Sequence, residues 1–294
     1  KLNSEETKKH AIMTITCGFL KIILRVPAAH IITAWLIRIL CTYPYARKWL
    51  NICYNSLKPR EKILFYHYFA KIFRSHDRRV SKGTWTVTFL NKQIVVPFSG
   101  THMWLEWDLA LSILGHEPEI TVTYKTLLMS KVRPTLFFDI GANYGLHSLL
   151  FLTHGIPTVS FEPNTACHET FNMLCQANTV TSDLQTIALS DQEGTAELWF
   201  QEKETWAGTI ITTPKDGVLP NPSLKRLPVK QITLDAFISK TGYAPQLIKI
   251  DTEGFDLKIL RGGMKTLSTA RPFVIFESCF CRGIDIQGIE PQPS

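Results

Sequence analysis

The sequence predicts an α/β fold with a doubly wound, mostly parallel sheet. Short apolar or β-branched runs alternate with helical stretches from about residue 117 onward, and acidic residues follow the runs at regular places. A glycine-rich turn comes directly after the first run. This alternation is typical of βαβ units, whose helices cover both faces of a parallel sheet. We therefore expect a Rossmann-like arrangement.

Five runs are the expected strands of this sheet. They cover residues 136–140, 158–162, 184–190, the start of 247–263, and 272–277. Helical stretches over 145–155 and 164–178 separate the first three. The segment after Asp191 reads as antiparallel or irregular until strand, turn and helix return at residue 247.

The first 80 residues differ from the rest in charge. They carry 15 Lys and Arg against 4 Asp and Glu, whereas the remainder carries 17 against 21. We predict a basic helical region over 1–80, then a Rossmann-like domain over 81–294. Within that domain, residues 84–98 alternate around Asn91-Lys92 and predict a β-hairpin.

Residues 11–41 are rich in Ile and Leu but contain Lys21, Arg25, Pro27 and Arg38. These residues leave no uncharged run of about 18 that could span a bilayer. Two short helices broken near Pro27 fit better. They either pack against the main domain or lie as amphipathic helices on an anionic membrane surface.

The remaining composition excludes several classes of site. The seven cysteines form no C-x-x-C pair, which indicates reduced thiols in a cytosolic compartment and no metal site. The protein is accordingly expected to be cytoplasmic, with any membrane contact peripheral.

Lys, Arg and aromatic residues intermingle over 43–80 without a recognised nucleic-acid motif, so no nucleic-acid partner is expected. The chain starts at Lys1 rather than Met, which suggests a fragment.

Carboxylates follow all five expected strands. In chain order they are Asp139, Glu162, Asp191, Asp251 and Glu277. Ligands of open parallel sheets bind outside the carboxyl ends of the strands. Carboxylates gathered at one edge repel one another unless a positive or hydrogen-bonding group lies among them. The pattern therefore predicts a ligand site at this edge.

The stretch FFDIGANYG, residues 137–145, contains the glycine-rich turn. Gly141, Gly145 and Asn143 are residue types that tolerate positive φ and allow close approach to a ligand. The next helix, from Gly145 or Leu146, would point its amino end at that ligand. Taken alone, the turn is equally compatible with a tight corner between strand and helix.

Glu162 lies 23 residues after Asp139. Near this spacing, the acid that ends the second strand of a nucleotide-binding βαβ unit binds ribose hydroxyls. The turn is not the G-x-G-x-x-G of dinucleotide folds and has no phosphate-binding Lys-Ser/Thr, which disfavours NAD. A cationic adenosine ligand without phosphate fits better, and S-adenosylmethionine meets that description.

The sequence resembles the FkbM-type methyltransferases, S-adenosylmethionine-dependent enzymes with the class I methyltransferase fold. The resemblance covers about residues 117–278. Its most specific part pairs DIGANYG with KIDTEG, and the matching stretches are EPEITVTYKTLL, FFDIGANYGLHS, VSFEPN, ALSDQEGTAELWF, ITLDAF, IKIDTEGFDLKILRG and VIFE.

The resemblance implies cofactor-binding roles for the matching positions. Those lining the methionine and ribose part are Asp139, Gly141, Asn143 and Gly145. The others are Glu162 at the ribose hydroxyls with Asn164 beside it, Ser190 and Asp191 near the adenine, and Asp251 near the sulfonium, facing the acceptor.

Methyl transfer to a hydroxyl also requires a base. Lys249, Asp251 and Glu253 gather at the fourth strand end, so Asp251 or Glu253 is the candidate base. Lys249 is either catalytic or a salt-bridge partner of these acids. His147 and Glu277 are weaker candidates.

Two departures from the family pattern bear on function. Asp256 stands where the family commonly has Glu, and only 17 residues follow Glu277, where class I sheets usually have two further strands. The end of the chain is therefore expected to be truncated or degenerate.

The leading prediction is O-methylation of a small molecule, sugar or lipid-linked glycan. The alternative is a scaffold of the same fold that has lost catalysis and docks to a membrane or partner through its basic helices. The hypothesis that the protein methylates nucleic-acid bases is weaker, since residues 251–254 lack the Asp/Asn-Pro-Pro-Tyr/Phe tetrad of such enzymes.

Overall fold

The computed structural model describes residues 83–98, 118–201, 204–211, 224–252 and 254–276, with scattered positions between 35 and 64. By its contacts, the chain divides into two units. The first unit contains Lys1–Arg133 with Gln176–Thr179, and the second contains Pro134–Cys175 with Val180–Ser294. Each unit is described by itself, and the expected boundary near residue 80 stays a prediction.

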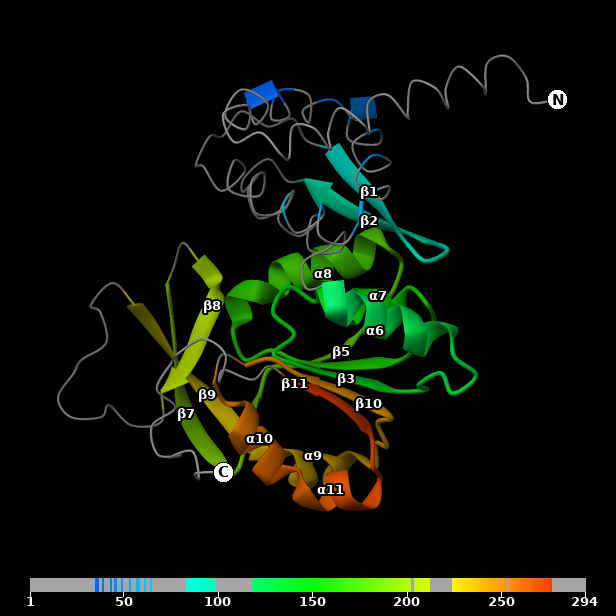
Figure 1. The fold of residues 1–294 in the computed structure, drawn as a ribbon. Helices are drawn as coiled ribbons and strands as arrows, with labels where there is room; N and C mark the ends of the chain where they lie inside the picture. The colour runs from blue at the N-terminus through cyan, green and yellow to red at the C-terminus, as the bar shows by residue number, and fades with distance from the viewer. Residues whose placement is uncertain are drawn as a thin grey trace, which may run out of the picture. The chain divides into compact units, whose positions relative to one another are not determined.

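The first unit contains the expected hairpin. Strands β1 (Gly83–Phe89) and β2 (Lys92–Phe98) pair antiparallel, and Phe89 lies opposite Lys92 (Figure 1). Val87, Phe89, Ile94 and Val96 are buried because alternate residues of a strand share one face. The prediction of a hairpin at 84–98 is therefore confirmed.

Helix α6 (Pro118–Met129) is the other continuous element described in the first unit. Its Tyr124 is fully buried. Most of the basic region over 1–80 lies outside the described residues. Of residues 11–41, the structure describes Trp35, Leu36 and Ile39, each helical and exposed. Within the part of the chain that is described, no helix has both the length and the apolar character needed to cross a membrane.

The second unit is built on a five-stranded parallel sheet, as expected. The strand order is β11-β10-β3-β4-β5, so the strand that leads into the glycine turn is central. The strands are β3 (Phe137–Ile140), β4 (Thr158–Phe161), β5 (Asp183–Gln185), β10 (Leu247–Ile250) and β11 (Phe273–Phe276).

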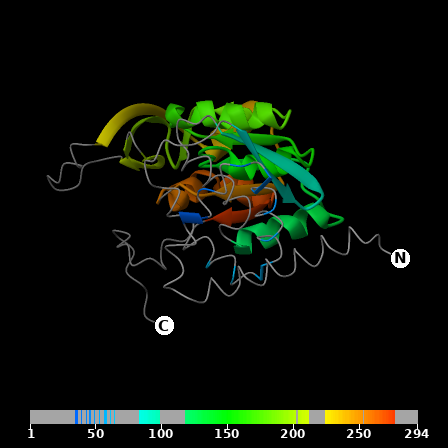
Figure 2. The same ribbon diagram turned by 90° about the horizontal axis from the view of Figure 1, so that it is seen from above.

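Helices cover both faces of this sheet (Figures 1 and 2). One face carries α7 (Leu146–Leu152) and α8 (His168–Ala177), preceded by the short 3₁₀ helix η2 (Thr165–Cys167). The other face carries α9 (Leu234–Thr241), α10 (Asp256–Gly262) and α11 (Met264–Thr269). The main core lies on this second side. Its fully buried members include Phe138, Ile248 and Leu234.

The prediction of a single strand over 184–190 is wrong, because this run forms two strands that belong to different sheets. Residues 183–185 form β5 of the main sheet, whereas β6 (Ala188–Ser190) joins a second sheet. Leu189 packs into the main core, and Ala188 packs into the core of the second sheet. The chain changes sheets here because successive side chains of β6 belong to two different cores.

The second sheet has the order β6-β9-β7-β8. Its further strands are β7 (Gly194–Gln201), β8 (Glu204–Ile211) and β9 (Leu224–Thr233). Strand β7 pairs antiparallel with both β8 and β9. The antiparallel interpretation of the segment after Asp191 is thus confirmed. Residues 277–294 lie outside the described residues, so the expectation that the chain lacks further strands there stays a prediction.

Candidate functional site

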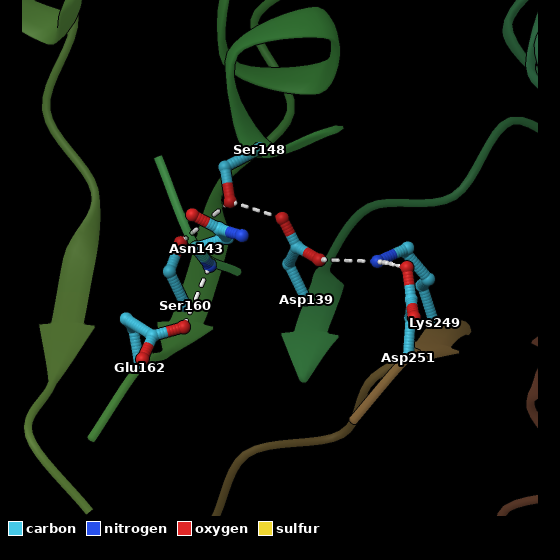
Figure 3. A network of polar contacts seen from close by, with 7 residues as sticks. All are labelled: Asp139, Asn143, Ser148, Ser160, Glu162, Lys249 and Asp251. Atoms are coloured by element: carbon cyan, nitrogen blue, oxygen red, sulfur yellow. Dashed lines mark hydrogen bonds and ion pairs between the residues drawn. The ribbon is translucent and has the colours of Figure 1, made fainter. Parts of the chain in front are cut away.

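The candidate site lies at the carboxyl edge of the main sheet, where β3, β4 and β10 end next to one another. Two groups of residues lie there, and Figure 3 draws their members other than Gly141 and Asn164. The turn cluster consists of Gly141, Asn143, Glu162 and Asn164. The carboxylate–lysine cluster consists of Asp139, Lys249 and Asp251.

The glycine turn is held tightly between its neighbours. The backbone N–H groups of Gly141 and Ala142 both donate to the carbonyl of Phe161 at 3.0 Å. Gly141 has a φ of 77°, and a Cβ atom there would lie 1.9 Å from the carbonyl oxygen of Asp251. Glycine at this position therefore lets the turn pack directly against the end of β10.

Replacing Gly141 with Ala should lower the free energy of unfolding by about 2 to 4 kcal/mol, because it adds a backbone clash to the strain of a positive φ. Gly242→Ala is the matched control, since Gly242 has a φ of 72° and nothing within 4 Å of the added carbon. That variant should lose about 1 kcal/mol. Urea unfolding of both variants measures the difference, and equal losses would show that close packing at Gly141 is unimportant.

Glu162 is the centre of the turn cluster. Its Oε2 accepts a hydrogen bond from the backbone N–H of Asn143 at 2.8 Å, and its Oε1 accepts one from the N–H of Asn164 at 2.7 Å. Asn143 presents its N–H from a left-handed conformation, with a φ of 51°. Each carboxylate oxygen keeps one further lone pair. Burial raises the pKa of Glu162 to about 7, although the two backbone N–H groups act to lower it.

Asn164 fixes the loop after Glu162 together with His168 and Cys167, two side chains without a role in the sequence-based prediction. The ring Nε2 of His168 lies 2.8 Å from the carbonyl oxygen of Glu162. Asn164 is the N-cap of η2, and its Oδ1 accepts a hydrogen bond from the N–H of Ala166 at 3.1 Å. The thiol of Cys167 lies 3.6 Å from Oδ1 of Asn143. Burial raises the pKa of that thiol, so the neutral form is favoured.

Asp139 is completely buried in the second cluster. Its Oδ2 accepts a hydrogen bond of 2.6 Å from Ser148 of α7, and the hydroxyl of Ser148 lies 2.7 Å from that of Ser160 on β4. Its Oδ1 lies 3.8 Å from Nζ of Lys249. Burial raises the pKa of Asp139 above its ordinary range, although Lys249 and Ser148 act to lower it. Neither serine was singled out, because a hydroxyl on a buried face has no signature in the sequence.

Lys249 bridges the two carboxylates of this cluster. Its Nζ lies 3.0 Å from Oδ2 of Asp251, and the lysine side chain is 2% exposed against 31% for Asp251. The backbone N–H of Asp251 donates to the carbonyl of Ile140 at 3.0 Å, which ties the end of β10 to β3. Of the three residues, Asp251 is therefore the one that a ligand can reach.

The other expected site residues are not members of either cluster. Gly145 is the N-cap residue directly before α7, and a Cβ atom there would meet the ring of Phe171 at 2.4 Å. Ser190 is buried on β6, and its hydroxyl donates to Asp191 at 3.2 Å. His147 lies in the first turn of α7. Glu253 and Glu277 fall outside the described residues, so their candidate roles stay predictions.

The comparison with models of protein families identifies one family. A family model described as the Methyltransferase FkbM domain matches residues 139–288, half of the chain. Among solved structures, the crystal structure of Methyltransferase FkbM from Methylobacillus flagellatus KT matches with 18% identity and a TM-score of 0.32. That match covers 59% of this chain and 43% of the other, so the chain spans less than half the length of that protein. No curated protein matches.

Proposed function

Because this chain belongs to the FkbM methyltransferase family, we propose that it transfers a methyl group from S-adenosylmethionine to an oxygen atom of a small molecule, sugar or lipid-linked glycan. The observation that carries the proposal is the geometry of Glu162. Two backbone N–H groups fix its carboxylate, one at each oxygen, and both oxygens keep a lone pair for a ligand.

That geometry fits the ribose of an adenosine cofactor. Two adjacent hydroxyl groups can each donate to one oxygen of a fixed carboxylate, and such charge-assisted hydrogen bonds are the stronger kind. The turn at Gly141 and Asn143 brings the backbone close to the carboxylate of Glu162. S-adenosylmethionine, when bound, supplies an electrophilic methyl group carried on a positively charged sulfur.

The carboxylate–lysine cluster would then lie on the reaction side. Asp251 is the candidate base, because its side chain is partly exposed while Asp139 is fully buried. It would accept the proton of the acceptor hydroxyl as the oxygen bonds to the methyl carbon and the sulfur keeps the electrons of the broken bond. Glu253 is the second candidate for this role. Neither residue identifies the acceptor.

Isothermal calorimetry with S-adenosylhomocysteine tests the cofactor assignment. The wild-type protein should bind, and Glu162→Ala should bind at least about 100-fold more weakly, because it loses two hydrogen bonds to a charged group. Glu169→Ala, which removes an exposed carboxylate from α8, is the control and should bind normally. Thermal unfolding checks that Glu162→Ala is folded.

Two results would count against this proposal. Equal binding by the wild type and Glu162→Ala would remove Glu162 from the cofactor site. Failure of the wild type to bind would favour the alternative, a scaffold of the methyltransferase fold docked to a membrane or partner through its basic N-terminal region.

A further inference from the structure

We propose that Lys249 is a positioning residue that moves between Asp251 and Asp139, and that this movement lets the site accept a positively charged ligand. In the described conformation Lys249 binds Asp251. When a cation arrives at Asp251, Lys249 turns to Asp139. The inference rests on the proposed function, because it takes S-adenosylmethionine as the cation.

The three residues are placed for such a movement by the sheet itself. Lys249 lies directly opposite Asp139 in the parallel register of β10 and β3. Asp251 is two residues after Lys249, and residues two apart in an extended chain point to the same side. Figure 3 shows Lys249 with a carboxylate on either side. A lysine side chain carries its ammonium on a flexible stem of four carbons, so the ammonium can reach either partner.

The two contacts of Lys249 are unequal. The distance from Nζ to Asp251 is 3.0 Å, which is that of a charged hydrogen bond, whereas the distance to Asp139 is 3.8 Å and too long for one. Within the described part of the chain, Oδ1 of Asp139 is buried and accepts no hydrogen bond. A buried carboxylate oxygen without a donor is costly. A shift of Nζ by about 1 Å would supply the missing bond.

Asp251 is held so that the charge beside it can change without movement of the backbone. Its N–H is bound to the carbonyl of Ile140, and its carbonyl lies against Gly141, where even a methyl group would not fit. Its side chain is the exposed member of the cluster. A ligand that reaches this carboxylate therefore meets the Lys249 ammonium on the other side of it.

Electrostatics makes the direction of the movement depend on the ligand. A cation at Asp251 repels Lys249, and Asp139 offers a carboxylate without a full partner on the side away from the ligand. A neutral ligand leaves Lys249 where it is. S-adenosylmethionine and S-adenosylhomocysteine form a matched pair of probes, since they differ by one methyl group and one positive charge.

The test compares the affinities of these two ligands for the wild type and Asp139→Asn, measured by calorimetry at low salt. Without the second carboxylate, Lys249 stays at Asp251. We expect S-adenosylmethionine to weaken about tenfold more than S-adenosylhomocysteine, as the penalty falls on the cation. Adding Lys249→Gln to Asp139→Asn should restore the wild-type ratio, because no ammonium then opposes the ligand. A purely structural role would weaken both ligands equally.

A second measurement uses the wild-type protein and covers the case in which Asp139→Asn does not fold. The nitrogen NMR resonance of the Lys249 ammonium, assigned with Lys249→Arg, should shift with S-adenosylmethionine and keep its position with S-adenosylhomocysteine. An identical response to both ligands would overturn the inference while leaving the proposed function standing. Absence of binding by either ligand would overturn both.

Discussion

Replacing Lys249 with Met should lower the free energy of unfolding by about 3 to 5 kcal/mol at pH 8, the usual loss when one member of a buried ion pair is removed. Asp139 has no exposed surface, and Lys249 is the cation beside it. The substitution keeps the apolar length of the side chain and removes the charge. Urea unfolding at pH 8 and pH 5 measures the effect.

The loss should be smaller at pH 5 than at pH 8. The pKa of Asp139 is raised by burial, so the folded state binds its proton more tightly than the unfolded state does. The resulting stability is fully present below the ordinary carboxyl range and is lost as the pH rises through the pKa of the folded state. Lys249 lowers this pKa, so removing Lys249 raises it. Protonation of Asp139 then stabilises the folded state up to a higher pH.

Two variants control this prediction. Lys230→Met removes an exposed lysine from β9 and should change stability by less than about 0.5 kcal/mol. Asp139→Asn combined with Lys249→Met removes both charges of this buried pair and should recover much of the loss. An equal deficit of Lys249→Met at both pH values would mean that lost packing, rather than an uncompensated carboxylate, causes it.

The sheet of the second unit follows closely from local sequence patterns, and its one error shows their limit. Apart from Asp139 and Lys249, the runs at 136–140 and 247–250 are apolar, and they are short and flanked by turn residues, which is sufficient to identify buried strands. The run at 184–190 has the same character, yet it divides between two sheets. The division depends on which core each side chain enters, and a local pattern does not contain that information.

The sequence likewise predicts which residues form the site, but not all of the contacts between them. The spacing of Asp139 and Glu162 identified two strand ends, but the backbone donors that hold Glu162 depend on the path of the turn. The sequence left Lys249 as either catalytic or an ion-pair partner. The ion pairs with Asp251 and Asp139 arise from strand order, because β10 lies beside β3 although more than 100 residues separate them.

Binding of S-adenosylhomocysteine should strengthen as the pH rises through about 7 and then level off. The pKa of Glu162 in the free protein is about 7, since burial disfavours its charged form. Ribose hydroxyls donate to an ionised carboxylate, so binding below this pH must first release a proton. The affinity should fall by about tenfold per pH unit well below pH 7. Calorimetry between pH 5.5 and 8.5 gives this profile.

Proton release supplies an independent measure of the same linkage. At pH 6.5, calorimetry in buffers of different ionisation enthalpy should show most of one proton leaving as the ligand binds. Glu162→Gln should bind weakly with neither proton release nor pH dependence, because its amide does not titrate. A pH dependence that survives in Glu162→Gln would assign the titration to another group. A flat profile in the wild type would show that Glu162 is already ionised before the ligand arrives, held so by the N–H groups of Asn143 and Asn164.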